Sequence, residues 1–222
     1  MKYRLVTTLI LVLACYNTHA REDFSDINLD TYLSEQGVLV TEGYVTAKQK
    51  AEFIQDLQRL PQIKNILEIG FNAGHSSELF LTTTNCEKLV SFDINIHSYT
   101  KIGAEFIQKK FGSRFELIEG DSKIQVPKFA AVHSTEKFDL IFIDGGHSLE
   151  CCLSDIQNCS KLAHRETLVL IDDYVAGVKM AVDASVRKGL IVLLDHKHIR
   201  DVYIPNVNGG DRIWVVAQYV ME

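Results

Sequence analysis

Four aspartates stand directly after short apolar segments of this chain: Asp93, Asp144, Asp172 and Asp173. Carboxylate oxygens accept hydrogen bonds from sugar hydroxyls, and they also bind hard cations such as Mg²⁺. In open α/β sheets, ligands bind just outside the carboxyl ends of the strands. If the apolar segments are strands of one sheet, these aspartates converge on a single ligand-binding edge.

The stretch from Leu67 to Ser76 (LEIGFNAGHS) predicts a buried strand, a glycine turn and the start of a helix. Such a turn lets the backbone approach a ligand closely. It is not the dinucleotide fingerprint G-x-G-x-x-G, because Asn72 replaces the second glycine and the third glycine is also missing. Glu68 would repel phosphate and would instead suit a cation, such as the ammonium of a methionine moiety. The alternative is an ordinary strand-to-helix turn that binds nothing.

Two further acidic positions suit the sugar and the base of a nucleoside. Asp93 lies 25 residues after Glu68, where a carboxylate can accept hydrogen bonds from vicinal ribose hydroxyls. Asp121 and Ser122 follow the apolar segment 115–118 and are placed for an adenine amino group. The alternative for both aspartates is a helix N-cap, a role that this residue type also fills well.

Asp144, Asp172 and Asp173 form the group that most suggests a metal site. Three crowded carboxylates repel one another unless a cation joins them or one of them is protonated. Oxygen-only ligands favour Mg²⁺, with waters and substrate oxygens completing its shell. His147 follows Asp144 by three residues, and its unperturbed pKa of about 6.5 suits a general base near neutral pH. The alternatives are solvated loop carboxylates that cap the next helix, and a histidine that only begins a helix.

The elements that must position these residues alternate along the chain. Apolar segments predict strands at 65–70, 88–92, 115–118, 138–143 and 167–171, and amphipathic segments predict helices at 47–60, 75–82, 99–111, 149–162 and 175–188. Short all-apolar strands separated by helices are typical of a parallel sheet covered on both faces. Two last strands, 190–194 and 212–218, are joined by turn-rich sequence, which favours an antiparallel pair at one edge.

With this order of motifs, the chain resembles the class I S-adenosylmethionine-dependent methyltransferases over roughly residues 46–218. It is similar to the branch with E-I-G-x-x-x-G-x-S in the first loop and D-G-x-H after the fourth strand. It is also similar, more loosely, to catechol O-methyltransferase-type enzymes. The resemblance implies a Rossmann-like, doubly wound α/β domain over residues 46–222. Its sheet would be seven-stranded and mostly parallel in the order 3-2-1-4-5-7-6, with the last strand antiparallel and helices on both faces.

The residues and the resemblance together give the candidate positions that bind the cofactor: Glu68, Gly70, Asn72, Gly74, Ser76, Asp93, Asp121, Ser122 and Asp144. In the catechol-type enzymes, an aspartate and an Asp-Asn pair hold a metal, and a lysine is catalytic. The resemblance therefore implies a metal at Asp144, Asp172 and Asp173, with Asp173 in place of the asparagine. His147 stands in place of the lysine, and both departures leave the mechanism open.

The resulting hypothesis is O-methylation of a small hydroxylated acceptor. A cation would lower the pKa of the acceptor hydroxyl, His147 would take its proton, and the oxygen would attack the methyl group of S-adenosylmethionine in line. One alternative is a non-catalytic cofactor-binding or interaction module. Another is a nicotinamide-dependent oxidoreductase, against which the missing third glycine argues.

Composition limits the class of protein and of partner. The chain has 222 residues, 46% apolar and 23% charged, as a folded domain does. A net charge of −6 argues against nucleic-acid binding, which needs a basic face. The cysteines after residue 20 lack C-x-x-C spacing, so core packing is their default role and any disulfide pairing is open: Cys86, Cys151, Cys152 and Cys159.

Residues 1–20 have the layout of a secretory signal peptide, with Lys2 and Arg4 before an apolar run that is too short to span a bilayer. We therefore expect a secreted or periplasmic protein without a membrane span, whose residues 21–45 form a cap or lid. The alternatives are a buried first element, lipid attachment at Cys15, and a leader without function in a cytoplasmic protein.

S-adenosylmethionine is made inside cells, so an exported enzyme needs another supply of it. Otherwise the leader is an uncleaved anchor or the cofactor is a different one. The acceptor and the oligomeric state stay open.

Overall fold

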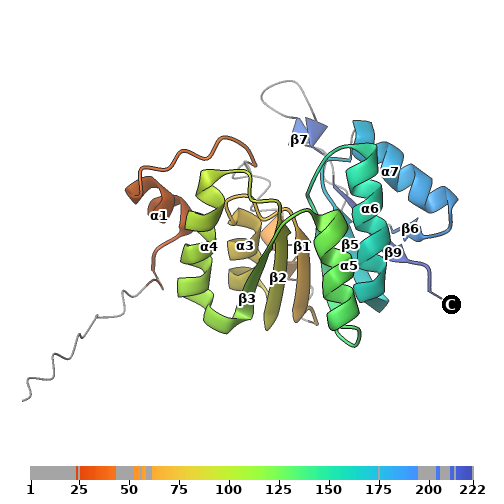
Figure 1. Cartoon of the computed structure of the whole chain (residues 1–222), viewed down its shortest axis with the longest axis horizontal. Helices are drawn as coiled ribbons and strands as arrows, with labels where there is room; N and C mark the ends of the chain where they lie inside the picture. Colours follow the sequence, from red (N-terminus) through yellow and green to blue (C-terminus); the bar gives the residue numbers. More distant parts are fainter. Residues whose placement is uncertain are drawn as a thin grey trace, which may run out of the picture.

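The computed structural model describes residues 24, 26–43, 53–55, 57–58, 62–174, 176–194, 204–205, 211–212 and 214–221 (Figure 1). The predicted leader and most of the predicted helix 47–60 lie outside these residues. Residues 53–55 and 57–58 of that helix are described and are helical, and Phe53 and Leu57 are buried, as the amphipathic pattern predicts. Within the described residues, no helix has the length and apolar character that a bilayer crossing requires.

Seven strands form one sheet in the order β3-β2-β1-β4-β5-β9-β6, which confirms the predicted order because β9 is the seventh strand along the chain in this sheet. The strands are β1 (Asn65–Ile69), β2 (Lys88–Asp93), β3 (Phe115–Glu119), β4 (Phe138–Ile143), β5 (Ala163–Ile171), β6 (Ile191–Leu193) and β9 (Val215–Tyr219). Neighbours from β3 to β5 pair in parallel, whereas β9 runs antiparallel to both β5 and β6. A separate antiparallel ladder joins β7 (Ile204–Pro205) to β8 (Asp211–Arg212).

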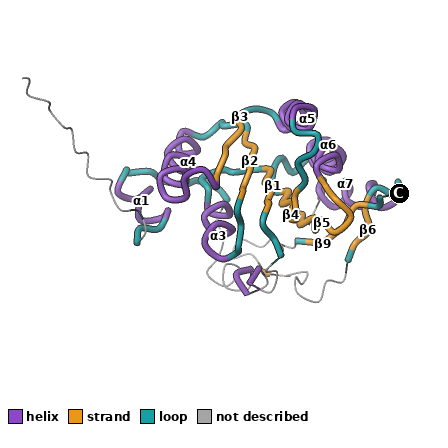
Figure 2. The backbone as a smooth tube through the Cα atoms, turned by 90° about the horizontal axis from the view of Figure 1, so that it is seen from below, coloured by secondary structure: helices purple, strands orange, loops and turns teal. Residues whose placement is uncertain are grey.

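Helices cover both faces of this sheet, as a doubly wound fold requires. The helices are α1 (Leu29–Glu35), α3 (His75–Thr83), α4 (Ser98–Phe111), α5 (Ser122–Val132), α6 (Leu149–Cys159) and α7 (Ala176–Arg187), with short 3-10 turns at Gly112–Arg114 and Ser160–Leu162. Figure 2 shows α3 and α4 on one face and α5, α6 and α7 on the other, with α1 beside α4.

Alternation along the strands explains why both faces are apolar. Ile66 of β1 belongs to the core on the α3 and α4 side, together with Phe80 and Phe106, whereas the next residue, Leu67, belongs to the core on the α5 to α7 side. Burying one such side chain contributes about 1.5–3 kcal/mol. Because both faces are filled with apolar side chains, the strand ends are where polar groups can gather.

Helix α1 and the β7–β8 ladder are not in the predicted pattern, and two elements of the main sheet and its helices also differ from it. Helix α5 is absent from the prediction because Pro127 lies in its interior and only a narrow face of it, including Val126 and Phe129, is buried. Strand β5 begins at Ala163 rather than at residue 167, because Ala163 pairs with Phe138 before an irregularity in the β4–β5 register. Polar residues between these points hide the strand from a pattern based on apolar runs.

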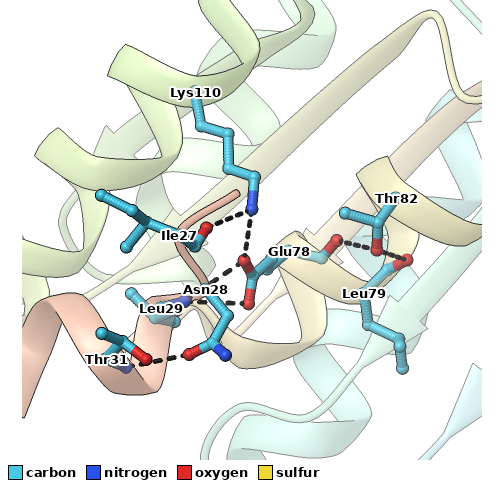
Figure 3. Close-up of polar contacts among 8 residues, drawn as sticks. All are labelled: Ile27, Asn28, Leu29, Thr31, Glu78, Leu79, Thr82 and Lys110. Atoms are coloured by element: carbon cyan, nitrogen blue, oxygen red, sulfur yellow. Dashed lines mark hydrogen bonds and ion pairs between the residues drawn. The ribbon is translucent and has the colours of Figure 1, made fainter. Parts of the chain in front are cut away.

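Residues 26–43, here called the N-terminal strap, are anchored on α3 and α4 (Figure 3). The backbone amide of Leu29 donates to both carboxylate oxygens of Glu78, at 3.2 and 3.3 Å. The Nζ of Lys110 donates to the same carboxylate at 3.0 Å and to the carbonyl of Ile27 at 2.6 Å. Leu29 and Leu33 are buried as well, so both polar and apolar contacts hold the start of the strap on the domain.

Candidate cofactor and acceptor site

A cavity of about 750 Å³ opens at the carboxyl ends of the parallel strands. Nine of the predicted site residues line it: Gly70, Asn72, Ser76, Asp93, Asp121, Ser122, Asp144, His147 and Asp172. They follow five different strands, so residues far apart in the sequence meet at one edge. The lining does not include Glu68, Gly74 or Asp173.

Backbone hydrogen bonds hold the strand ends together at this edge. The pairs are Gly70 N to Phe92 O, Gly120 N to Asp93 O and Asp144 N to Ile69 O, each at 2.8 Å, and Asp172 N to Ile143 O at 3.0 Å. Each bond lies at the carboxyl end of a parallel ladder, where the acidic residues follow. The loops that carry the carboxylates are therefore fixed by the sheet itself.

The glycine turn after β1 brings two loops into contact. Gly70 has a φ of 96°, and a Cβ there would lie 2.0 Å from the carbonyl oxygen of Asp144. Any side chain at this position would push the β1 and β4 loops apart. Gly74 instead caps α3 with a φ of 99°, and a Cβ there would meet the Phe71 ring at 2.6 Å. Gly74 thus permits the helix to begin and does not face the cavity.

Glu68 does not contact the cavity, which corrects the expected contact with a cationic ligand. It points to the α3 side of β1 and is fully buried. Its carboxylate accepts hydrogen bonds from the hydroxyls of Ser76 and Ser77, and from Ser91 at 2.5 Å. Desolvation raises the pKa of Glu68 to about 7, although the serine hydrogen bonds oppose this. Ser91 lies opposite Glu68 in the β1–β2 register, which the sequence alone does not reveal.

Asp93 lies at the cavity wall and organises two loops. Its Oδ2 accepts a hydrogen bond from the amide of Asn72 at 2.8 Å, and its Oδ1 accepts one from the amide of Asn95 at 2.6 Å. The carboxylate therefore ties the glycine turn to the end of β2. A carboxylate has about four lone-pair sites, so it can also accept hydrogen bonds from ribose hydroxyls.

Asp121 has the capping role considered for it, and Ser122 begins the same helix. Asp121 is the N-cap of α5, where its Oδ1 accepts from the amide of Lys123 at 2.9 Å. Ser122 donates its hydroxyl to Asp155 Oδ1 at 2.6 Å. Both residues line the cavity as well, so the capping role and a ligand-binding role are compatible.

His147 lies beside two of the three predicted metal-site aspartates. Its Nε2 is 3.2 Å from Asp173 Oδ2 and 3.8 Å from Asp144 Oδ1. One ligand atom from each of Asp144, His147 and Asp173 lies within 4.8 Å of the others. Asp172 is not part of this group, and its Oδ1 accepts a hydrogen bond from the amide of Asp173 at 2.8 Å. The neighbouring carboxylates of Asp144 and Asp173 raise the pKa of His147, against desolvation.

Comparison with known families identifies the fold and the class of enzyme. Residues 67–174 match the family model described as a methyltransferase domain. The order of the strands is that of the Rossmann-like methyltransferase fold as well. The matched residues run from β1 to the loop after β5, and so include the nine predicted site residues that line the cavity. No curated protein matches the chain in sequence.

Solved structures share the fold of this methyltransferase domain. An O-methyltransferase from Bacillus cereus, solved with S-adenosylhomocysteine, is 17% identical with a TM-score of 0.66, over 86% of this chain and 90% of that one. The O-methyltransferase TomG from Streptomyces achromogenes, solved with S-adenosylmethionine, is 18% identical with a TM-score of 0.64, over 87% and 88%. A ribosomal protein L11 methylase from Lactobacillus delbrueckii is 15% identical with a TM-score of 0.56, over 81% of each chain. At these identities the likeness concerns the fold, which therefore does not determine the acceptor.

Four non-glycine residues that the structure describes have a left-handed backbone. One is Ala176, the first residue of α7 (φ 45°), and the other three lie in loops at the carboxyl edge of the sheet. These three are Asn72 after β1 (φ 52°), Asn95 after β2 (φ 58°) and Asp173 after β5 (φ 51°). Asparagine and aspartate tolerate this conformation better than other residues with a Cβ. Such backbone strain concentrates at functional sites, where surrounding structure holds it in place.

The N-terminal strap adds cavity residues that the sequence did not indicate. Asp30 and Glu42 line the cavity together with His75 and His97 of the methyltransferase domain. Asp30 Oδ1 lies 2.8 Å from His75 Nε2, and Glu42 Oε1 lies 2.5 Å from His97 Nε2. Asn72 Nδ2 also donates to the Glu42 carbonyl at 3.3 Å. No motif marks these residues, because their role depends on where the strap crosses the domain.

Aromatic side chains line the cavity on the side of Asp172. Phe53, Phe142 and Trp214 all contribute to the lining. The Phe53 ring centroid is 5.4 Å from Trp214 and 6.1 Å from Phe142. Buried rings in the same cavity as carboxylates and His147 form a lining that suits an acceptor with one apolar face and polar oxygens.

Proposed function

We propose that this methyltransferase domain transfers the methyl group of S-adenosylmethionine to a hydroxyl oxygen of a small acceptor. The observation that carries the proposal is the single cavity that brings Asp93, Asp121 and Asp144 together around the Gly70 turn. Its volume of about 750 Å³ lies within the usual range of about 300–1,000 Å³ for small-molecule sites.

The polar groups of the cavity fit each part of the cofactor. Asn72 Oδ1 is buried without a hydrogen-bond partner among the described residues, so it can accept from the ammonium of the methionine part. Asp93 would accept from the ribose hydroxyls, and Asp121 from the adenine amino group. The bound cofactor would supply the electrophilic methyl group. A cavity wall rich in carboxylates also complements the positive sulfonium.

His147 is the proposed general base for the acceptor hydroxyl. More than half of its side chain is exposed (58%), so its imidazole can reach a substrate in the cavity. Asp144 and Asp173 flank the ring and would stabilise the imidazolium that forms when it takes the proton. The remaining contribution is alignment of the acceptor oxygen with the methyl group, which a rigid strand edge supplies.

A divalent cation is part of this proposal. The carboxylates of Asp144 and Asp173 lie near enough to share one ion, and oxygen ligands suit Mg²⁺. Asp172 would add negative charge beside them, so that the three carboxylates together would offset the charge of the ion and that of the His147 ring when it takes the proton. A bound cation would lower the pKa of the acceptor hydroxyl.

The structural neighbours support oxygen as the methylated atom. Two of the more similar ones are O-methyltransferases, and these were solved with S-adenosylhomocysteine or S-adenosylmethionine. The L11 methylase shares the fold less closely. A small hydroxylated acceptor also agrees with the aromatic part of the cavity lining.

A turnover assay with methyl-labelled cofactor and a panel of phenols, sugars and hydroxy acids tests this function. We expect His147→Ala to lower kcat at least about 100-fold, because a general base is lost, while affinity for S-adenosylhomocysteine is unchanged. Added imidazole should restore part of the rate. The matched control is His164→Ala, which removes a histidine paired with Asp139 at 3.1 Å and not among the cavity-lining residues. If His147→Ala turns over at the unaltered rate, His147 is not the general base. If turnover is undiminished in excess chelator, the reaction does not use a divalent cation.

A further inference from the structure

Asp155 of α6 is a buried carboxyl between two loops of the cavity. Only 1% of it is exposed. Its Oδ1 accepts the Ser122 hydroxyl at 2.6 Å, and its Oδ2 has no hydrogen-bond partner among the described residues. A Cβ built on Gly145 would lie 3.4 Å from that Oδ2. The carboxyl thus contacts the start of α5 on one side and approaches the β4–α6 loop on the other.

Packing alone does not explain a carboxyl at this position. The other buried residues of the same helix include Cys152, Ile156 and Cys159, which are apolar and fill the core beneath the sheet. Burying a carboxyl among them is costly, because it loses its hydration and gains one hydrogen bond. Desolvation accordingly raises the pKa of Asp155 to about 6. A residue that destabilises the core in this way needs a compensating role.

The hydrogen bond to Ser122 points to that role. Ser122 is the first residue of α5, and Asp121 is the N-cap just before it. Both line the cavity, as do Gly120 and Gly145. This bond joins the start of α5, at the cavity, to α6. If the bond is lost, the start of α5 loses one of its contacts with α6, and the Asp121 carboxylate next to it is held less firmly at the cavity wall.

We propose that Asp155 is a positioning residue for the adenine end of the cofactor, holding Ser122 so that Asp121 accepts a hydrogen bond from the adenine amino group. This inference rests on the proposed function, because it needs the adenosyl group in this cavity. It concerns recognition of the base and not the chemistry at His147. Its consequence is that selectivity for adenine depends on a residue that does not line the cavity.

Calorimetric titration with S-adenosylhomocysteine and with S-inosylhomocysteine tests the proposal, because the second ligand carries a carbonyl where the first has the amino group. We expect unaltered protein to prefer the adenosyl ligand, since a site built to accept a hydrogen bond rejects an analogue that cannot donate it. Asp155→Ala and Ser122→Ala should each lower the affinity for S-adenosylhomocysteine at least about tenfold, while the affinity for S-inosylhomocysteine changes little. Asp155→Asn keeps an acceptor for Ser122 and should retain most of the preference.

Thr167→Val is the matched control, because it removes a buried hydroxyl that donates to the Phe138 carbonyl at 2.6 Å and does not line the cavity. Ser122→Ala keeps the test informative if Asp155→Ala fails to fold. The proposal is overturned if both alanine variants keep the preference of the control, or if they weaken the two ligands equally. If the unaltered protein binds S-adenosylhomocysteine without preference, this inference fails and the proposed function stands. If it binds neither ligand, the proposed function itself fails.

Discussion

Glu68 and Asp93 are carboxylates at the ends of neighbouring strands, yet their surroundings give them different properties. Asp93 lies at the cavity wall, where it accepts hydrogen bonds from two backbone amides. Glu68 is fully buried, and among the described residues its recorded hydrogen-bond donors are three serine hydroxyls. Sequence spacing indicates an acidic strand end in both cases. It does not indicate which side of the sheet each side chain takes, because that depends on pairing and helix position.

The burial of Glu68 predicts a pH-dependent stability. Its pKa is 4.5 in an exposed state and about 7 in the folded protein. Between these values the folded state binds the proton more tightly, so the free energy of unfolding falls as the pH rises from about 4.5 to 7. The linked loss is on the order of 2–3 kcal/mol. Urea denaturation of the unaltered protein and of Glu68→Gln between these pH values measures it.

The difference between the two proteins isolates Glu68 from other titrating groups. We expect Glu68→Gln to remove this part of the pH slope, since glutamine does not ionise. Glu116→Gln, which changes an exposed glutamate of β3, is the control. If the free energy of unfolding changes with pH by the same amount in the unaltered protein and in Glu68→Gln, then Glu68 does not cause the pH dependence.

At the scale of the elements, the N-terminal strap packs on the domain at one end and contributes residues to the cavity lining. Lys110 joins the strap to α3 through the Ile27 carbonyl and Glu78, and both charged side chains are nearly buried, at 12% and 10% exposure. We expect Lys110→Met to destabilise the protein by about 2–4 kcal/mol, because it leaves the Glu78 carboxylate buried without its cation. Denaturation together with limited proteolysis of residues 26–43 measures the loss. Affinity for S-adenosylhomocysteine should fall as well, since Asp30 and Glu42 of the strap line the cavity.

Lys179→Met serves as the control for this element. Lys179 pairs with Asp183 at 2.9 Å on α7, where the two side chains are 52% and 36% exposed, so its loss should cost at most about 0.5 kcal/mol. The double variant Lys110→Met with Glu78→Gln should recover part of the stability. If the strap is cleaved no faster in Lys110→Met than in Lys179→Met, then this ion pair does not anchor it.

The elements that could be predicted are those whose pattern is visible within a short stretch of the sequence. The parallel strands are buried on both faces and therefore appear as apolar runs, and their ends carry the carboxylates that meet at the cavity. Helix α5 was missed because Pro127 interrupts its pattern. The strap residues Asp30 and Glu42 could not be predicted, because tertiary contacts to His75 and His97 give them their position. The same holds for Asp155, whose partner Ser122 lies on another helix.

At the scale of the whole molecule, the apolar side chains that stabilise the fold lie on the faces of the sheet, and the polar groups proposed to bind ligands lie at its carboxyl edge. Two apolar cores fill the faces of the sheet, while polar groups from five strand ends surround one cavity. The net charge of −6 agrees with the carboxylate-rich wall and with a ligand that carries positive charge. The predicted signal peptide lies outside the described residues and stays a prediction, which N-terminal sequencing of the native protein tests.

The central claim is that this cavity binds the adenosyl cofactor through the carboxylates at its strand ends, and calorimetry tests it most directly. We predict that the unaltered chain binds S-adenosylhomocysteine at one site and does not bind NAD, and that Asp93→Ala weakens S-adenosylhomocysteine at least about tenfold. The control is Asp139→Ala, because Asp139 accepts backbone amides of Lys64 and Asn65 at 2.9 and 2.8 Å but does not line the cavity. Binding of NAD in preference to S-adenosylhomocysteine, or equal affinities in the two variants, would contradict the account.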